Sequence, residues 1–320
     1  MERPDILKAL SGVVEKGIAA TNIASILEQP EVDAVVAHLI DYQNPFRQNL
    51  PRRPGSGAAY LSNTRTAGNT PAQFVADTDT LMEDTGTYGR IPWTYKTIAT
   101  RGKITRKAQK IGMSLLDIMA EELEGKSEDF RNYEEWAIIY GNSSTATQFD
   151  GLDKIFVVTT PGAQCVAMTT TSGGQALSLT KLDQAIDKCA LPPNMLVMSR
   201  RTRRQLRTLL QASQRFVNTV EVVGGFKVLS YDDIPVFVST QILDTYTFNG
   251  TADSASTGGT CTNLYALNTA DCFMSVLTDV TVEPLAKDSS QYQQFDIYED
   301  VALVMKNIKK HVCLIGIKDS

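Results

Sequence analysis

The chain has 320 residues, of which 42% are hydrophobic and 21% charged, and its formal net charge at pH 7 is −5. This hydrophobic content suffices to build the cores of one or two ordinary domains, whereas the negative charge argues against a protein whose whole surface grips nucleic acid. Because no apolar run approaches the ~20 residues needed to span a bilayer and the start lacks a signal-peptide pattern, we expect a protein outside membranes.

The first 60 residues are predicted to form an arm. Apolar residues recur at helical spacing between Leu7 and Ile18, and a second short helix is predicted over 31–40. Proline, glycine and arginine then accumulate between residues 44 and 71. This composition disfavours both helix and central strand, so we predict an extended arm or loop there.

The following segment combines an acidic limb with a basic limb. Residues 73–84 hold four acids, a glycine-rich turn follows at 86–89, and 90–110 hold seven basic residues and no acid. Threonine and aromatic residues over 93–105 favour strand, so the two limbs are predicted to pair in a long hairpin. Because an isolated hairpin is marginally stable in water, this arm is expected to rest on a neighbouring subunit.

A long amphipathic helix is predicted over 115–140. At about 1.5 Å per residue it would be about 39 Å long, which is unusual for a globular domain. Its apolar face is formed by Met119, Leu123, Phe130, Tyr133, Ala137 and Tyr140. Its glutamates, Glu135 among them, are assigned to other faces. Gly125 followed by Ser127 predicts a bend with a new N-cap, and the turn at 141–144 ends the helix.

The rest of the chain reads as a mixture of strands and short helices. Strands are predicted at 155–158, 195–198, 220–223, 226–229, 234–238, 264–267, 270–277, 298–305 and 311–317. Helices are predicted at 179–189, capped by Ser178 or Thr180, and after Ser199. The polar stretch 248–259 is expected to be a surface loop. This order of elements predicts the α+β class.

Residues suited to catalysis or metal binding are scarce. His38 and His311 are the two histidines, and five cysteines are scattered without a C-x-x-C pair, which indicates reduced thiols. We find no phosphate-binding loop, nucleophile elbow or H-E-x-x-H helix. The sequence therefore predicts no enzyme, no cofactor and no metal.

The helix after Ser199 carries the densest group of charges. Its basic residues are Arg200, Arg201, Arg203, Arg204 and Arg207. Guanidinium groups suit phosphates, but they also suit bidentate ion pairs across protein interfaces. The cluster is therefore a candidate interface or nucleic-acid contact, with nucleic acid the less favoured of the two.

The order of these parts resembles the major capsid proteins of tailed bacteriophages, which have the Hong Kong 97-type fold. The resemblance rests on the basic limb at 95–104, the long helix at 115–140, its end at 138–144 with 149–152, the strand and helix entry at 191–201, the strand at 234–236 and the returning strand at 295–302. The helix end, with its Gly-Asn turn and following Asp-Gly-Leu, is the most specific of these matches.

The resemblance implies an N-terminal arm, an extended β-hairpin loop, a peripheral domain with a spine helix and a compact axial domain. The implied boundaries are 1–60 for the arm, 61–110 for the loop, 111–178 with 284–320 for the peripheral domain, and 179–283 for the axial domain. The implied function is self-assembly into hexamers and pentamers of an icosahedral or prolate head around double-stranded DNA, bound without sequence specificity. Implied partners are a separate scaffolding protein, a portal and a decoration protein, with assembly in the host cytoplasm and residence in the virion.

Basic residues of the arm and loop are the candidates for contacts between subunits. They are Arg52, Arg53, Arg90, Lys96, Arg101, Lys103 and Arg106. Two alternatives stay open: an encapsulin-like nanocompartment shell protein, which shares the fold but encloses cargo proteins, and an α+β enzyme that uses scattered carboxylates.

Overall fold

The computed structural model describes residues 44–66, 74–77, 86–112, 118–159, 164–212, 219–222, 226–250, 253–254, 258–285 and 291–318. All of them belong to one compact unit, 40–320. The helices predicted before residue 41, and His38 with them, lie outside the described residues. So does the acidic limb at 73–84 apart from 74–77, which form no strand.

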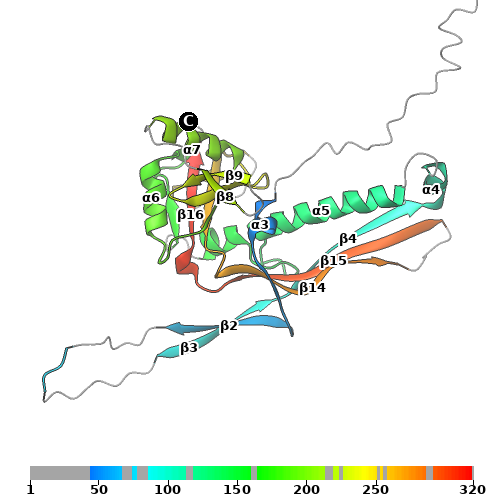
Figure 1. The fold of residues 1–320 in the computed structure, drawn as a ribbon, viewed down its shortest axis with the longest axis horizontal. Coiled ribbons are helices and arrows are strands. Elements are labelled where there is room, and N and C mark those ends of the chain that lie inside the picture. Colours follow the sequence, from blue (N-terminus) through cyan, green and yellow to red (C-terminus); the bar gives the residue numbers. More distant parts are fainter. Residues whose placement is uncertain are drawn as a thin grey trace, which may run out of the picture. The chain divides into compact units, whose positions relative to one another are not determined.

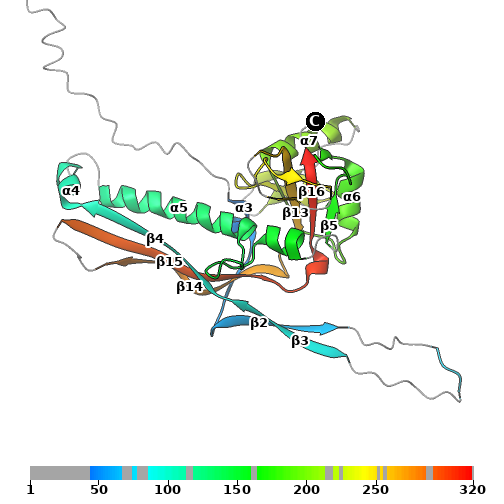
Figure 2. The same ribbon diagram turned by 180° about the vertical axis from the view of Figure 1, so that it is seen from behind.

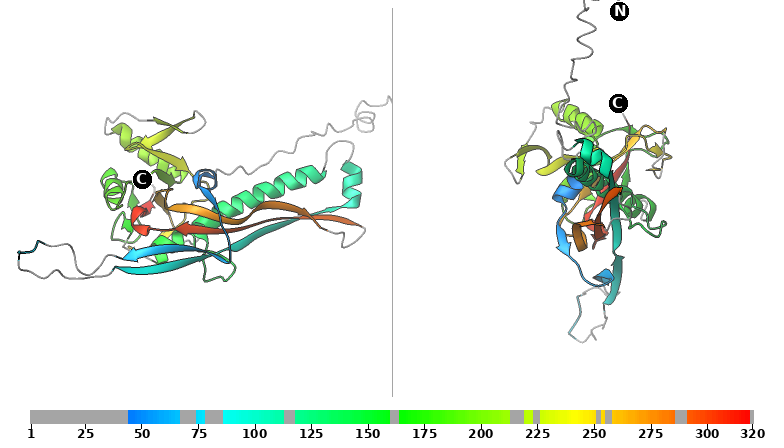
Figure 3. Two further views of the ribbon diagram at one scale, coloured as in Figure 1. Left: turned by 60° about the horizontal axis from the view of Figure 1, so that its bottom comes forward. Right: turned by 90° about the vertical axis from the view of Figure 1, so that its right-hand side faces the viewer.

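A four-stranded sheet with one long helix against it forms the first part of this unit (Figures 1 and 2). The strand order is β1 (Arg52–Pro54), β14 (Cys272–Pro284), β15 (Tyr292–Met305) and β4 (Lys96–Thr105). Strand β15 runs antiparallel to both of its neighbours, and β1 runs parallel to β14 at the edge. The helix is α5 (Ile118–Tyr140), which contacts β4 and β15 and runs along the sheet in Figure 3.

The basic limb pairs differently from the prediction. Strand β4 lies beside β15, from Lys96 opposite Val301 to Thr105 opposite Tyr292. Alternate residues of β4 face the core, where Ile98 and Ile104 are buried. Burial of this apolar face at about 25 cal/mol per Å² outweighs the weak attraction between solvated charges.

A separate two-stranded hairpin joins β2 (Ala59–Thr66) to β3 (Thr87–Thr94). The register is continuous, with Ala59 opposite Thr94 and Thr66 opposite Thr87. The prediction of an extended arm without helix over 44–71 is therefore wrong in part, since this stretch contains β1, β2 and the short helix α3 (Pro45–Asn49). Proline is compatible with these places because Pro45 occupies the first helical turn and Pro54 an edge strand.

The long helix ends as predicted but differs from the prediction within its length. Helix α5 continues through Gly125, and the Ser127 hydroxyl donates to the Leu123 carbonyl at 2.7 Å, so the predicted new cap is wrong. The start of the predicted helix lies outside the described residues. Glu135, which was predicted to lie largely off the apolar face, is fully buried, and so is Glu134.

The chain doubles back onto the end of α5 through two glycines. The Gly141 N–H donates to the Ala137 carbonyl and the Gly151 N–H to the Gly141 carbonyl, both at 2.8 Å. A Cβ on Gly151 would lie 2.6 Å from the Gly141 nitrogen, which is why this turn requires glycine. The strand predicted at 155–158 is instead a π-helix, Lys154–Thr159, because a short buried apolar run does not distinguish helix from strand.

An eight-stranded sheet with helices packed on it forms the second part of the unit. Its order is β5 (Cys165–Ala167), β16 (Val312–Lys318), β13 (Cys261–Leu267), β7 (Met195–Met198), β10 (Ile234–Val238), β9 (Phe226–Tyr231) and β8 (Thr219–Val222), with β6 (Gln175–Ala176) beside β16. Helices α6 (Leu179–Asp187) and α7 (Arg200–Ala212) bury Leu182, Leu206 and Leu210 in the same core cluster as Leu196 and Leu314.

Smaller elements complete the described chain. They are α4 (Arg106–Gly112), the 3₁₀-helix Ile308–Lys310, and the pair β11 (Thr247–Phe248) and β12 (Asp253–Ser254), which lies in the predicted loop. The Ser199 hydroxyl accepts from the Thr202 N–H at 3.3 Å, as predicted for the start of α7. Ser178 occupies the N-cap of α6 but makes no capping hydrogen bond.

Sheet membership does not follow the predicted domain boundaries at several strands. Strands β4 and β14 belong to the four-stranded sheet, although the loop and the axial domain were their predicted places. The tail is divided: β15 stays in the four-stranded sheet, whereas β16 pairs with β13 and β5. The chain passes from one sheet to the other at the 3₁₀-helix 308–310. The apolar pattern of a strand does not reveal which sheet the strand joins. The division into arm, loop, peripheral and axial domains stays a prediction.

Candidate assembly interface

The β2–β3 hairpin exposes apolar side chains on both of its faces. Leu61 is 49% exposed, Tyr88 71% and Ile91 41%. Residues directly opposite share a face, so the register of Leu61 with Pro92 and of Tyr88 with Arg65 puts Leu61 and Tyr88 together, while Ile91 points to the other side. A two-stranded hairpin without a supporting surface is marginally stable, which makes this one a candidate for contact with another molecule.

A second exposed apolar row lies on β14. Leu277, Val280 and Val282 are 42%, 37% and 46% exposed, and in the described part of the chain β1 pairs only with the start of this strand, at 274–276. An open strand edge with exposed apolar side chains invites association. We call the hairpin residues Leu61, Tyr88 and Ile91 together with Leu277, Val280 and Val282 of β14 the assembly surface.

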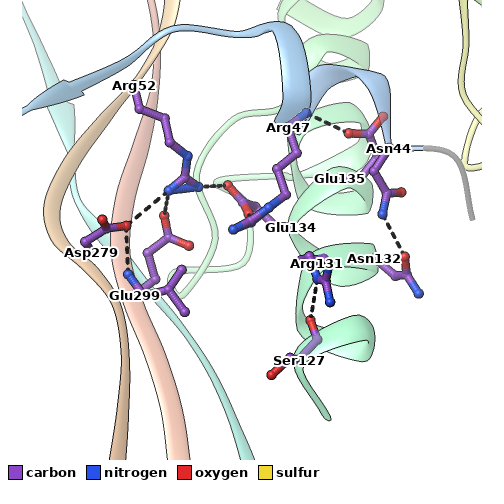
Figure 4. Close-up of polar contacts among 11 residues, drawn as sticks. Asn44, Arg47, Arg52, Ser127, Arg131, Asn132, Glu134, Glu135, Asp279 and Glu299 are labelled. Atoms are coloured by element: carbon purple, nitrogen blue, oxygen red, sulfur yellow. Dashed lines mark hydrogen bonds and ion pairs between the residues drawn. The ribbon is translucent and has the colours of Figure 1, made fainter. Parts of the chain in front are cut away.

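The segment 44–54, which precedes the hairpin, is fastened to α5 by a buried carboxylate (Figure 4). We call this segment, containing α3 and β1, the strap. The Phe46 and Arg47 N–H groups donate to Glu135 at 3.3 and 3.0 Å, and the Ser239 hydroxyl donates to it at 3.0 Å. The Asn44 side chain, at the N-cap of α3, makes no capping hydrogen bond. Glu135 supplies the capping acceptor in its place.

Arginines of the strap neutralise further buried acids. Glu134 accepts from both Arg47 and Arg52. Arg52 also donates to Glu299 of β15 at 2.7 Å and lies 3.5 Å from Asp279. Since Glu134 and Glu299 are fully buried, removing Arg52 would leave Glu299 without its ion-pair partner and Glu134 with Arg47 alone. This dependence holds the strap on α5 and β15.

Burial shifts the acid–base behaviour of this cluster. It raises the pKa of Glu135 to about 7 although the Arg47 and Phe46 N–H groups oppose the shift. Burial, with repulsion from Glu134, likewise raises the pKa of Glu299 to about 7 against the attraction of Arg52. Burial alone would lower the pKa of Arg52, but Glu134, Glu299 and Asp279 together raise it. The cluster thus contains two carboxyl groups that titrate near neutral pH.

Replacing Glu299 by glutamine is expected to weaken the pH dependence of stability. Its folded pKa of about 7 exceeds its unfolded value of about 4.3, so its stabilising effect is complete below pH ~4.3 and is lost as pH rises through 7. The loss amounts to at most about 4 kcal/mol. Oε2 of Glu299 is buried without a hydrogen-bond partner among the described residues, so the amide of E299Q imitates the protonated acid.

The measurement is urea unfolding of wild type and E299Q at pH 6 and pH 8. Wild type should be more stable at pH 6, and E299Q should lose part of that difference. Some slope should remain, because Glu135 and Asp153 also have pKa values raised to about 7 by burial. An E299Q protein with the same pH slope as wild type would contradict this assignment.

The predicted intersubunit residues all have places on the described surface, and most have partners within the chain. Arg52 belongs to the buried cluster, and Arg101 forms a bidentate pair with Asp296. Arg90 donates to Asn63 at 3.2 Å and Lys96 to the Ala146 carbonyl at 2.5 Å. Arg53 lies 4.0 Å from the Phe273 ring and Lys103 3.9 Å from the Tyr292 ring, whereas Arg106 is exposed on α4. Hydrogen bonding to Arg101 holds the pKa of Asp296 below its usual range. Their role between subunits stays a prediction.

The five arginines predicted after Ser199 do lie on one helix, α7. Arg201 donates to the Thr260 carbonyl at 2.8 Å and lies 3.6 Å from Asp244. The other four, Arg200, Arg203, Arg204 and Arg207, are exposed. Arg47, Glu134 and Glu299, which hold the strap, were not among the site residues predicted from the sequence. A signal existed in the position of Glu134, one helical turn from both Phe130 and Ile138.

Two features are absent from the described residues: a cluster of metal ligands and a membrane-spanning helix. These residues contain no group of three histidine, cysteine, aspartate or glutamate side chains that could hold an ion. Among the described helices, none has the length and apolar character to cross a bilayer. His311 is buried, accepts from the Asn268 N–H through Nδ1 at 3.0 Å, and has its pKa lowered by burial to about 4, which makes it a structural residue.

Comparisons with known proteins give one family and a consistent set of folds. The family model of the SU10 major capsid protein matches residues 96–318, whereas comparison with curated protein sequences gave no match. Similar solved structures include the capsid of a native GTA particle (TM-score 0.67, 14% identity, 94% of this chain and 99% of that chain). They also include Mycobacterium phage Bobi (0.66, 11%, 93% and 98%) and the holo-SrpI encapsulin complex of Synechococcus elongatus PCC 7942 (0.65, 12%, 92% and 95%).

Proposed function

Because the chain belongs to the SU10 major capsid protein family, we propose that its copies form the hexamers and pentamers of a phage head that encloses double-stranded DNA. The family consists of structural capsid proteins and not of enzymes. The chain is therefore a component of a virion capsid, and the capsid contains many copies of it. The fold is the Hong Kong 97-type fold expected from the order of the sequence elements.

The observation that carries the proposal is the assembly surface. The hairpin exposes apolar side chains on both faces, and β14 exposes three more beside an open edge. A second copy of the chain is the partner that a shell supplies to every subunit, and repeated contacts of this kind close when related by rotation. In the proposed shell, the hairpin of one copy lies on a neighbour and the strap fixes the base of that hairpin.

Further partners follow from the same proposal. A separate scaffolding protein guides assembly in the host cytoplasm, a portal occupies one vertex, and a decoration protein can bind the finished surface. The packaged DNA contacts the shell without sequence specificity. The family membership supports these roles, which are those that the resemblance to phage capsid proteins implies.

An encapsulin-like shell is the second candidate, and one observation favours it. The encapsulin complex named above is as similar in fold as the phage capsids are, with a TM-score of 0.65. Such a shell would enclose cargo proteins in place of a genome. The contents of the particle therefore distinguish the two functions.

Electron microscopy of particles formed by the full chain tests the proposal. We expect closed shells with hexameric and pentameric faces when the chain is produced with its scaffolding protein. Particles from infected cells should contain DNA that resists DNase until the shell is opened. Shells filled with a protein cargo and free of DNA would support the encapsulin-like function, and a small oligomer under all conditions would overturn both.

A further inference from the structure

One face of α7 presents a row of cationic side chains. Arg200, Arg203, Arg204 and Arg207 follow one another at steps of three, one and three residues, so they share one side of the helix. All four are exposed, whereas Thr202, Leu206 and Leu210 are buried. The fold thus fixes the helix by its apolar face and leaves the arginine face outward.

These four arginines together border a surface groove. Its volume is about 500 Å³, and the described residues that line it are Arg200, Arg203, Arg204 and Arg207. A neighbouring groove of about 380 Å³ shares Arg204 and is otherwise lined by Arg201, Gln205, Thr208, Ala176, Leu177 and Leu209. We call the first groove, which is lined by the four arginines, the arginine groove.

The charges of the arginine groove are not balanced within the described chain. Helix α7 contains no acidic residue, and the four guanidinium groups form no hydrogen bond or ion pair with any described residue. Arg201 differs, since it is tied to Thr260 and Asp244. Like charges at i, i+3 and i, i+4 destabilise a helix by a few tenths of a kcal/mol per pair, so a bound anion would relieve repulsion that the isolated subunit carries.

We propose that the arginine groove binds the phosphodiester backbone of nucleic acid without reading its sequence. Guanidinium groups pair bidentately with phosphates, and their spacing of about 5–6 Å along the helix suits consecutive charges of one strand. The groove has no aromatic or apolar lining residue among those described, as an acidic peptide would need for anchoring.

The test is fluorescence anisotropy of the full chain with a labelled 20-base-pair DNA of arbitrary sequence. The variant R200Q/R203Q/R204Q/R207Q should bind about 10–100-fold more weakly near 0.1 M salt, and the dependence of log K on log salt should become shallower by about one for each lost phosphate contact. A second DNA of unrelated sequence should bind equally well to the wild type.

The matched control is K107Q/K110Q/R131Q/K309Q, which removes four exposed basic residues elsewhere and should leave DNA affinity within about twofold. Equal loss in both variants would overturn the site, because binding would then follow net charge alone. Tighter binding of a glutamate-rich peptide than of DNA would overturn the nucleic-acid assignment in favour of an acidic protein segment. DNA binding at this groove is separate from shell formation. A variant that forms normal shells but loses DNA affinity would support the groove. A chain that binds DNA through the groove and forms no shells would contradict only the proposed function.

Discussion

A chain in which Ala59 is joined to Thr94 through an Asn-Gly turn is expected to fold but to form no closed shells. Ala59 and Thr94 are the first pair of the β2–β3 hairpin, and a two-residue Asn-Gly loop closes such a pair. The four-stranded sheet, α5 and the strap remain. The deletion removes three of the exposed apolar residues of the assembly surface, Leu61, Tyr88 and Ile91. Electron microscopy should show no particles, and sedimentation should show small oligomers.

A point variant separates the hairpin surface from the mere presence of the hairpin. L61S/Y88S/I91S keeps both strands and the Trp93 to Ser62 hydrogen bond of 3.1 Å, yet removes the apolar contact area. It should assemble at least tenfold less efficiently, since three lost apolar contacts weaken each interface by several kcal/mol. The control, shortening only the connection between Thr66 and Thr87, should retain shells. Normal particles from the deletion variant would refute the role assigned to the hairpin.

Glu134→Ala is expected to lower the free energy of unfolding by about 2–4 kcal/mol, because it removes the shared partner of two arginines. Glu134 is fully buried, while Arg47 and Arg52 are only 21% and 28% exposed. Loss of this acid should release the strap from α5. Urea unfolding followed by the fluorescence of Trp136, which packs near this helix end, measures the loss, and faster trypsin cleavage after Arg47 and Arg52 reports the release.

Glu124→Ala is the matched control for this substitution. Glu124 lies on the same helix but is exposed, so its replacement should change stability by no more than about 0.5 kcal/mol. E134Q keeps the shape of the side chain and should fall between the two. If E134A were as stable as E124A, the buried cluster would not hold the strap.

Local signals in the sequence were sufficient for most of the elements. The glycine at 141 ends α5, Ser199 caps α7, and alternating apolar residues locate β10, β13 and most of β15 and β16. A hairpin was predicted from strand-forming residues, but residues 87–89 of its predicted turn belong to β3, and the partner strand is β2. Signals of this kind work because they depend on residues within a few positions of each other.

The candidate site was less predictable. The basic residues of the arm were expected to face a neighbour, yet Arg52 reaches Glu134 and Glu299 inside the same chain. The arginines of α7 were visible as a cluster, but only the structure separates Arg201, which has partners, from the four that border the groove.

The sequence by itself determined the class of the fold, the long helix with its glycine stop, and the composition of the hairpin arm. Tertiary structure alone decided that β4 pairs with β15, that β16 crosses to the other sheet, and that Glu134 and Glu135 are buried. The physical reason is distance along the chain: Arg52 and Glu299 are separated by 247 residues. These buried charges are tolerated only because ion-pair partners distant along the chain contact them. No local sequence pattern encodes such a contact.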